Sequence, residues 1–216
     1  MHSSAVKVKI CGITRVEDAT LAAELGAWGL GFIFSDKSPR RCSVTTAREI
    51  CRGLQHRDVE KVGVFFNEKV EDVNAIIEQV GLSYAQLHGT ETPEYCTQIN
   101  AKILKAIQQL NPEDENLLDA YRCWFLLDAP PVADQHGGTG HTANWALGRN
   151  IAKKYPLFLA GNLGADNILR ALQEVRPLGA DLSSSVEESP GIKDHEKLRQ
   201  LFQVLQDAKY VLRSTR

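Results

Sequence analysis

Eight short apolar runs alternate with helical patterns along the chain, and this alternation restricts the fold more than any other feature. The runs are rich in β-branched and aromatic residues, which is typical of buried strands. They occupy Val6–Ile10, Trp28–Phe34, Lys61–Phe66, Tyr84–Leu87, Lys102–Ala106, Cys123–Asp128, Leu157–Ala160 and Ala180–Ser183. Strand–helix alternation predicts a parallel sheet, and eight units predict one closed (β/α)8 TIM barrel over residues 1–216. A doubly wound open sheet is the main alternative.

The segments between these runs have the apolar spacing of amphipathic helices. One apolar face is formed by Val70, Val73, Ile76, Ile77 and Val80, and another by Leu198, Leu201, Phe202, Leu205 and Ala208. Polar pairs indicate two helix starts: Thr45-Thr46 ahead of one helix and Asp166-Asn167 in the first turn of another. Glycines indicate three helix ends, at Gly26, Gly81 and Gly179.

Composition excludes several classes of protein. The formal net charge is -2 and there is no basic run with interleaved aromatics, so we expect no nucleic-acid partner. The apolar runs are far shorter than the roughly 18 residues of a membrane span, and the first residues lack the regions of a signal peptide. The five cysteines are widely spaced without a Cys-x-x-Cys pair, which argues against zinc and against a disulfide framework. We expect a reduced cytoplasmic protein with no membrane partner.

Catalytic groups of a barrel follow its strands, and two such positions carry titratable side chains. Cys11 ends the first run just before Gly12, and Asp128 ends the sixth. A thiolate base and a carboxylic acid can act on opposite ends of one substrate. Lys9 lies two residues before Cys11 on the same side of the strand and would favour the thiolate. The alternatives are a buried structural thiol at Cys11 and, at Asp128, a carboxylate that caps a helix or pairs with a lysine.

Other strand ends offer groups that could bind a ligand. Arg40 follows Pro39 in the loop after the second run and could clamp an anion, although a solvated surface arginine is the usual case. His88 follows the fourth run and could instead cap a turn. Gly161-Asn162 and Ser184-Ser185 follow the last two runs, where barrel loops commonly bind phosphate through backbone N–H groups; ordinary tight turns are the alternative. The histidines show no metal-ligand spacing and no nucleotide fingerprint is present, so we expect neither metal nor cofactor.

These residues, taken together with their flanking segments, resemble the phosphoribosylanthranilate isomerase family of tryptophan biosynthesis. The matching segments follow one another through nearly the whole chain. They are Lys9-Ile10-Cys11-Gly12-Ile13-Thr14, Ser38-Pro39-Arg40, Val62-Gly63-Val64-Phe65, Gln86-Leu87-His88-Gly89, Leu127-Asp128-Ala129, Gly137-Gly138-Thr139-Gly140, Leu159-Ala160-Gly161, Asp181-Leu182-Ser183-Ser184 and Pro190-Gly191 with Lys193-Asp194.

The resemblance implies a barrel that catalyses an Amadori rearrangement of a phosphoribosyl amine without a cofactor. It implies that Asp128 is the general acid and Cys11 the general base. It also implies that Arg40 holds a carboxylate and that backbone groups in loops six to eight hold phosphate. The expected substrate-binding set is Arg40, Lys9, His88, Gly138, Gly161, Asn162, Ser184 and Ser185.

Two positions depart from the family pattern. Asn162 replaces a second glycine and Ser185 replaces the glycine before Val186. Asparagine tolerates a left-handed backbone better than most residues, whereas serine at a positive φ would be strained. Two other functions remain as alternatives: a related isomerase of histidine biosynthesis, which Cys11 disfavours, and a catalytically silent phosphate-binding barrel. We expect a monomer acting on a small phosphorylated molecule, with a homodimer as the alternative.

Overall fold

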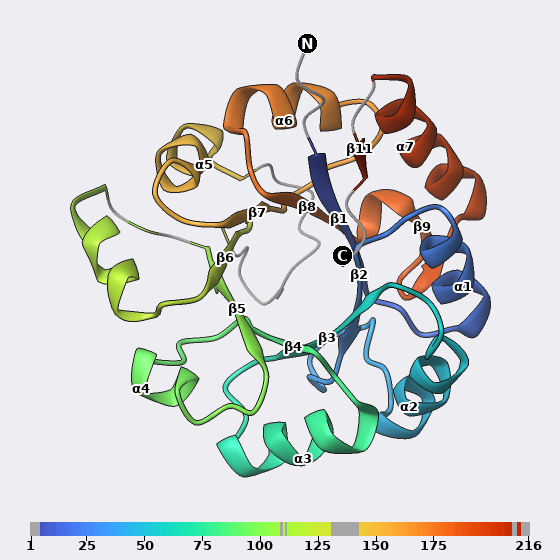
Figure 1. Cartoon of the computed structure of the whole chain (residues 1–216), viewed down its shortest axis with the longest axis horizontal. Helices are drawn as coiled ribbons and strands as arrows, with labels where there is room; N and C mark the ends of the chain where they lie inside the picture. Colours follow the sequence, from blue (N-terminus) through green and yellow to red (C-terminus); the bar gives the residue numbers. More distant parts are fainter. Residues whose placement is uncertain (1–4, 109, 111, 131–142, 209–210, 213–216) are drawn as a thin grey trace.

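Eight parallel strands form a closed barrel with helices around it (Figure 1). The structure is a computed structural model and describes residues 5–108, 110, 112–130, 143–208 and 211–212. The barrel strands are β1 Ala5–Cys11, β2 Gly29–Ile33, β3 Glu60–Phe65, β4 Tyr84–Leu87, β5 Lys102–Ile107, β6 Trp124–Leu127, β7 Leu157–Leu159 and β8 Gly179–Leu182. Because β1 pairs with both β2 and β8, the sheet has no open edge there, and the doubly wound alternative is excluded.

Helices cover the outside of the sheet, as the apolar spacing predicts. They are α1 Val16–Glu24, α2 Val44–Gly53, α3 Val70–Val80, α4 Pro93–Cys96, α5 Trp145–Ala152, α6 Ile168–Val175 and α7 His195–Asp207. Helix α3 buries Val73, Ile77 and Val80 and ends at Gly81, whose φ of 76° is left-handed. Helix α7 begins at Asp194, whose side chain accepts hydrogen bonds from the N–H groups of Glu196 and Lys197.

Three expected helix boundaries and one expected helix are wrong. Asp166-Asn167 precedes α6, which begins at Ile168 with Asn167 as its N-cap residue, and so does not lie in its first turn. Helix α2 begins at Val44 and is capped by the Ser43 side chain, so Thr45-Thr46 lies inside its first turn. Gly179 is the first residue of β8, while α6 ends earlier, where Arg176 takes the left-handed conformation. Between β5 and β6 the described element is a 3-10 helix, η1 Pro112–Ala120, in place of a regular helix.

Smaller elements follow the last barrel strand. A 3-10 turn, η2 Ser184–Val186, leads into an antiparallel pair formed by β9 Glu187–Ser189 and β10 Ile192–Lys193. Near the C-terminus, β11 Val211–Leu212 pairs in parallel with the start of β1. The β9–β10 pair precedes α7, so it lies at the carboxyl-terminal end of the barrel strands, on the side where active sites form.

Aromatic side chains fill the opposite end of the barrel interior. The cluster contains Trp28, Tyr84, Trp124 and Phe158, which lie within one residue of the starts of β2, β4, β6 and β7. The Trp28 ring centroid is 5.0 Å from that of Phe158. Such contacts bury large apolar areas and close the amino-terminal end. The polar groups Lys9, Gln86 and Asp181 are buried on strands of the same barrel. The interior is therefore apolar at one end and polar toward the carboxyl ends of the strands.

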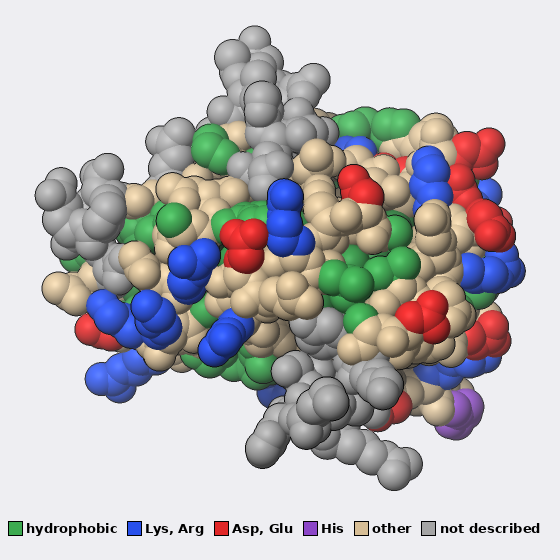
Figure 2. Space-filling view, turned by 90° about the horizontal axis from the view of Figure 1, so that it is seen from above, with side chains coloured by type: hydrophobic (Ala, Val, Ile, Leu, Met, Phe, Trp, Pro, Cys, Tyr) green, Lys and Arg blue, Asp and Glu red, His purple; other side chains and the backbone are tan. Residues whose placement is uncertain are grey.

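The outer surface carries charges of both signs. In the face drawn in Figure 2, basic and acidic side chains lie side by side with small apolar areas. Among the described residues, no helix combines the length and apolar character that crossing a membrane requires.

Candidate active site

A pocket opens where the carboxyl ends of the barrel strands meet. Its lining comes from seven of the eight strands or the loops that follow them: Cys11, Ile33, Ser35, Lys37, Ser38, Arg40, Val64, Phe65, Phe66, Gln86, His88, Asp128, Ala129, Ala160, Gly161, Asn162, Leu163, Asp181, Ser183, Ser184 and Ser185. In a parallel barrel these ends lie at one rim, so residues far apart in sequence become neighbours. The pocket combines a thiol, two carboxyl groups, an imidazole and a guanidinium.

Cys11 lies above a buried ion pair. Lys9 and Asp181 are register partners on β1 and β8, and Lys9 Nζ lies 2.8 Å from Asp181 Oδ1. The two side chains are 0% and 9% exposed, so neither charge could be buried without the other except at high cost. Asp181 lines the pocket, whereas Lys9 lies beneath it. Lys9 therefore acts on the pocket through Asp181 and Cys11.

A glycine on the neighbouring strand makes room for this arrangement. Gly31 is the register partner of Cys11 on β2. A Cβ at Gly31 would lie 2.7 Å from Cys11 Sγ and 3.0 Å from Lys9 Nζ. The Cys11 sulfur and the Lys9 ammonium nitrogen are therefore both packed against the bare backbone of β2, and they are close to one another.

Burial raises the pKa of the Cys11 thiol above its usual value. The positive charges of Lys9 and Lys193 lower it, while the charge of Asp181 raises it further. The sequence led us to expect that Lys9 would favour the thiolate. Lys9 does act in that direction, but burial prevails and the pKa of the Cys11 thiol lies above its ordinary value.

Asp128 follows β6 and faces His88 across the pocket. Asp128 Oδ1 accepts a hydrogen bond from the N–H of Ala129 at 2.8 Å, and Oδ2 lies 3.4 Å from His88 Nε2. Gln86 Nε2 lies 3.0 Å from His88 Nδ1. If that amide donates, the imidazole proton resides on Nε2 and points toward Asp128. Gln86 and His88 thus form a short polar row that ends at the candidate acid.

Arg40 reaches the pocket from the loop after β2. Its Nε and Nη2 atoms both bind the carboxylate of Glu187, with Nη2 at 2.9 Å from Oε2. Gly12, with φ of 76°, lies beneath the arginine stem, since a Cβ there would be 2.9 Å from Arg40 Cδ. The Arg40 side chain is 12% exposed and lines the pocket, so it lies at the pocket wall rather than on the open surface.

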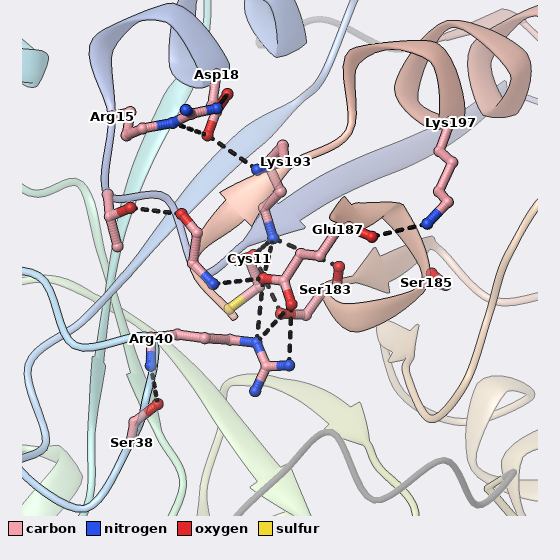
Figure 3. A network of polar contacts seen from close by, with 12 residues as sticks. Cys11, Arg15, Asp18, Ser38, Arg40, Ser183, Ser185, Glu187, Lys193 and Lys197 are labelled. Atoms are coloured by element: carbon pink, nitrogen blue, oxygen red, sulfur yellow. Dashed lines mark hydrogen bonds and ion pairs between the residues drawn. The ribbon is translucent and has the colours of Figure 1, made fainter. Parts of the chain in front are cut away.

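Glu187 also binds Lys193, and the whole group forms one network (Figure 3). Lys193 Nζ lies 2.8 Å from Glu187 Oε1 and 2.5 Å from the carbonyl oxygen of Cys11. Burial opposes the ionised form of Glu187, but the hydrogen bond from Arg40 and the charge of Lys193 outweigh burial and lower the pKa of this carboxyl group.

The loops after β7 and β8 lie side by side at the pocket. Gly161 and Asn162 have φ of 81° and 51°, so Asn162 adopts the left-handed backbone that the family glycine suggested. Ser185 is not among the residues with positive φ, so replacing glycine there causes no strain. The Ser185 hydroxyl donates to the carbonyl of Leu163 and joins the two loops. The small residues leave backbone N–H groups near the pocket, as phosphate binding requires.

The structure brings most of the predicted residues together. Cys11, Arg40, His88, Asp128, Gly161, Asn162, Ser184 and Ser185 line the pocket. Lys9 lies beneath it, and Gly138 lies outside the described residues.

The sequence alone does not indicate Gln86, Asp181, Glu187 or Lys193 as site residues. A signal existed for Asp181, because a carboxylate within an apolar strand needs a buried partner and Lys9 is a matching charge on the first strand. Across the described ranges, no cluster of three or more His, Cys, Asp or Glu side chains could hold a metal ion.

The sequence is similar to those of one known protein family. The model of the family described as N-(5'phosphoribosyl)anthranilate (PRA) isomerase matches residues 8–204. The N-(5'-phosphoribosyl)anthranilate isomerase of Syntrophus aciditrophicus is 47% identical over 195 residues, which cover 89% of this chain and 84% of that protein.

Solved structures give the same result. A crystal structure of monomers made from the dimeric phosphoribosylanthranilate isomerase of Thermotoga maritima has a TM-score of 0.82 at 36% identity, covering 94% of this chain and 99% of its own. A phosphoribosylanthranilate isomerase in complex with reduced 1-(o-carboxyphenylamino)-1-deoxyribulose 5-phosphate has a TM-score of 0.82 at 35% identity, with the same coverage of 94% and 99%.

Proposed function

The chain belongs to the N-(5'-phosphoribosyl)anthranilate isomerase family, and we propose from this premise how its residues divide the reaction. It is an isomerase of tryptophan biosynthesis that converts N-(5'-phosphoribosyl)anthranilate to 1-(2-carboxyphenylamino)-1-deoxyribulose 5-phosphate by an Amadori rearrangement. The division rests on one observation: a single pocket contains a thiol, a carboxyl group, an arginine and two small-residue loops.

Asp128 is the general acid of this proposal. As a carboxylic acid it protonates the ribose ring oxygen, the bond between C1' and that oxygen breaks, and the nitrogen lone pair forms a Schiff base. The backbone N–H of Ala129 fixes this carboxyl group, and His88 Nε2 lies 3.4 Å from its Oδ2 atom without a hydrogen bond between them. General acid catalysis requires the acid to reach the atom it protonates, and Asp128 lines the pocket directly.

Cys11 is the general base. Its thiolate removes the proton from C2', the electrons form a C1'–C2' double bond, and the nitrogen regains its lone pair. The resulting enolamine tautomerises to the 2'-ketone. Lys9 and Lys193 lower the pKa of the thiol against the effect of burial, so both stabilise the thiolate that this step needs.

Substrate binding uses the two sides of the pocket. Arg40 holds the carboxylate of the anthranilate ring from the loop after β2. Backbone N–H groups around Gly161, Asn162, Ser184 and Ser185 hold the phosphate from the loops after β7 and β8. Gly138 of the expected set belongs to the same proposal, although it lies outside the described residues. The histidine-pathway alternative has no support here, because the end of β1 carries Cys11.

The remaining expectations belong to this proposal: a monomer that works in the cytoplasm on a small phosphorylated substrate, with no nucleic-acid partner. Light scattering on the purified chain tests whether it is a monomer, since the Thermotoga maritima relative is described as dimeric.

An assay with freshly made N-(5'-phosphoribosyl)anthranilate, in which the product is identified by mass and by its ketone, tests the activity. Failure to form the deoxyribulose product would refute it.

A further inference from the structure

A buried lysine and a partly buried arginine share one carboxylate beside the pocket. Glu187 lies between Arg40 and Lys193, and its side chain is 4% exposed while that of Lys193 is 0% exposed (Figure 3). Arg40 comes from the loop after β2, whereas Glu187 and Lys193 come from the β9–β10 pair. The network therefore joins the loop after β2 to the β9–β10 pair, two segments that are not neighbours in the barrel sheet.

Glu187 occupies only one edge of the Arg40 guanidinium. It accepts from Nε and Nη2, and within the described part of the chain Nη1 has no hydrogen-bond partner. Nη1 points away from Glu187 in Figure 3, and Arg40 lines the pocket. A guanidinium can bind one carboxylate on its Nε side and a second through Nη1. Because Glu187 holds the Nε and Nη2 edge of Arg40, Nη1 is the atom left to bind a ligand.

The donors of this network leave one position for an anion. Glu187 is one carboxylate between the side chains of Arg40 and Lys193, and burial lowers the pKa of Lys193 although Glu187 opposes that effect. Lys193 donates its other hydrogen bonds to the carbonyl oxygens of Cys11 and Ser183, so its ammonium group is directed away from the pocket. Nη1 of Arg40 is therefore the donor of this network that remains for an incoming carboxylate.

Backbone packing leaves the network little freedom. The N–H of Gly191, with φ of 83°, donates to Glu187 Oε1 at 3.2 Å. The stem of Arg40 lies on Gly12, which has no Cβ to displace it. A bidentate ion pair held in this way restricts a long side chain that would otherwise sample many rotamers.

We propose that Glu187 is a positioning residue that aims Nη1 of Arg40 into the pocket and thereby sets the preference for aryl amines that bear a carboxylate. Lys193 ties Glu187 to the strand end that carries Cys11. The inference rests on the proposed function in one respect, that the ligand of Arg40 is the substrate carboxylate.

Binding of two stable probes tests this role. One probe is reduced 1-(o-carboxyphenylamino)-1-deoxyribulose 5-phosphate, and the other is the same compound without the ring carboxyl group. Calorimetry gives the ratio of their Kd values for wild type, Glu187→Gln, Arg40→Met and the double variant. We expect Glu187→Gln to reduce the preference for the carboxylated probe about tenfold or more. The Kd of the carboxyl-free probe should be unchanged, and Glu187→Gln should add nothing in the Arg40→Met background.

Two further variants complete the test. Lys197 donates to the backbone carbonyl of Glu187 and not to its carboxylate, so Lys197→Met should leave the preference at the wild-type value. Glu187→Asp keeps the charge but shortens the reach, and should lower the preference by a smaller factor; it replaces Glu187→Gln if that variant does not fold. In turnover, Glu187→Gln should raise KM more than it lowers kcat.

Equal weakening of both probes by Glu187→Gln would overturn the inference, because it would show a general structural role. An unchanged preference would overturn it as well. Failure of the proposed function has a different signature, since wild type would then not convert the substrate or would not prefer the carboxylated probe.

Discussion

Lys9 and Asp181 form a buried ion pair in the barrel interior, with Lys9 Nζ 2.8 Å from Asp181 Oδ1. The pair joins β1 to β8 at the point where the barrel closes. Burial disfavours the charged form of Lys9, but Asp181 and Cys11 together outweigh burial and raise the pKa of this lysine. Two residues after Lys9 the chain presents Cys11 to the pocket, so the pair supports the candidate base both sterically and electrostatically.

Replacing Lys9 with methionine should lower the stability of the fold and raise the pKa of Cys11, the proposed base. Asp181 would be left buried without a partner, which costs about 3–5 kcal/mol of unfolding free energy. Cys11 would lose the charge that lowers its pKa, so the acid limb of the kcat/KM profile should move to higher pH. Asp181→Asn added to Lys9→Met should recover stability and part of the shift, because Asp181 itself raises the Cys11 pKa. An unmoved limb in Lys9→Met would contradict this role.

Gly31→Ala should reduce activity much more than stability. The new Cβ would lie 2.7 Å from Cys11 Sγ and 3.0 Å from Lys9 Nζ, so the thiol must move from its position. Displacement of a catalytic group by about 1 Å can cost roughly 10²-fold in rate. Gly53→Ala is the matched control, since nothing lies within 4 Å of its new Cβ. Steady-state kinetics of the two variants should differ sharply; similar kcat values would count against the proposed place of Cys11.

The loop after β7 should tolerate change at Asn162 better than at Gly161. Asn162→Gly keeps the left-handed conformation at φ of 51° and should leave inorganic phosphate binding within a few-fold. Gly161→Ala places a Cβ 2.9 Å from the backbone nitrogen of Ala143 and 3.1 Å from that of Ala129, at φ of 81°. Phosphate affinity should fall at least tenfold for Gly161→Ala. Titration calorimetry compares the two, and equal affinities would mean that this loop does not hold the phosphate.

Alkaline pH should destabilise the fold. Burial raises the pKa of Cys42 and Cys96 to about 11 and that of Cys51 and Cys123 to about 12. Thiols of the unfolded chain ionise near pH 8.5 to 9, so the folded state binds more protons above that range. Stability is then complete below about pH 8.5 and is lost as pH rises toward 11 to 12, by about 1.4 to 2 kcal/mol per thiol at pH 10. Urea unfolding at pH 7 and pH 10 measures the loss, and Cys51→Ala should reduce it.

The strands could be predicted because their apolar period and length are local properties. All eight expected runs overlap the observed strands, and Tyr84–Leu87 matches β4 at both ends. The wrong predictions concern segments whose structure depends on tertiary contacts. Gly179 looked like a helix end, but its place in β8 is set by close packing, since a Cβ there would meet the carbonyl oxygen of Lys7 at 2.5 Å. The 3-10 helix η1 and the β9–β10 pair had no periodic signal long enough to identify them.

The site was predictable where position alone carried the information. Groups just after strands gather at one rim of a barrel, and this rule placed Cys11, Asp128 and the loops after β7 and β8. Residues that work through partners were missed. Glu187 acts on Arg40 across 147 positions, and Lys193 reaches the carbonyl of Cys11 across 182. No local pattern in one sequence connects such pairs.

The central claim is that Cys11 and Asp128 are the base and the acid of one rearrangement. Its most direct test is steady-state turnover of N-(5'-phosphoribosyl)anthranilate by wild type, Cys11→Ala and Asp128→Asn, together with the Kd of the reduced product analogue for each. We predict that kcat falls by about 10²–10⁴-fold or more in each variant while the analogue still binds within a few-fold of wild type. Turnover near the wild-type rate in either variant would contradict the claim.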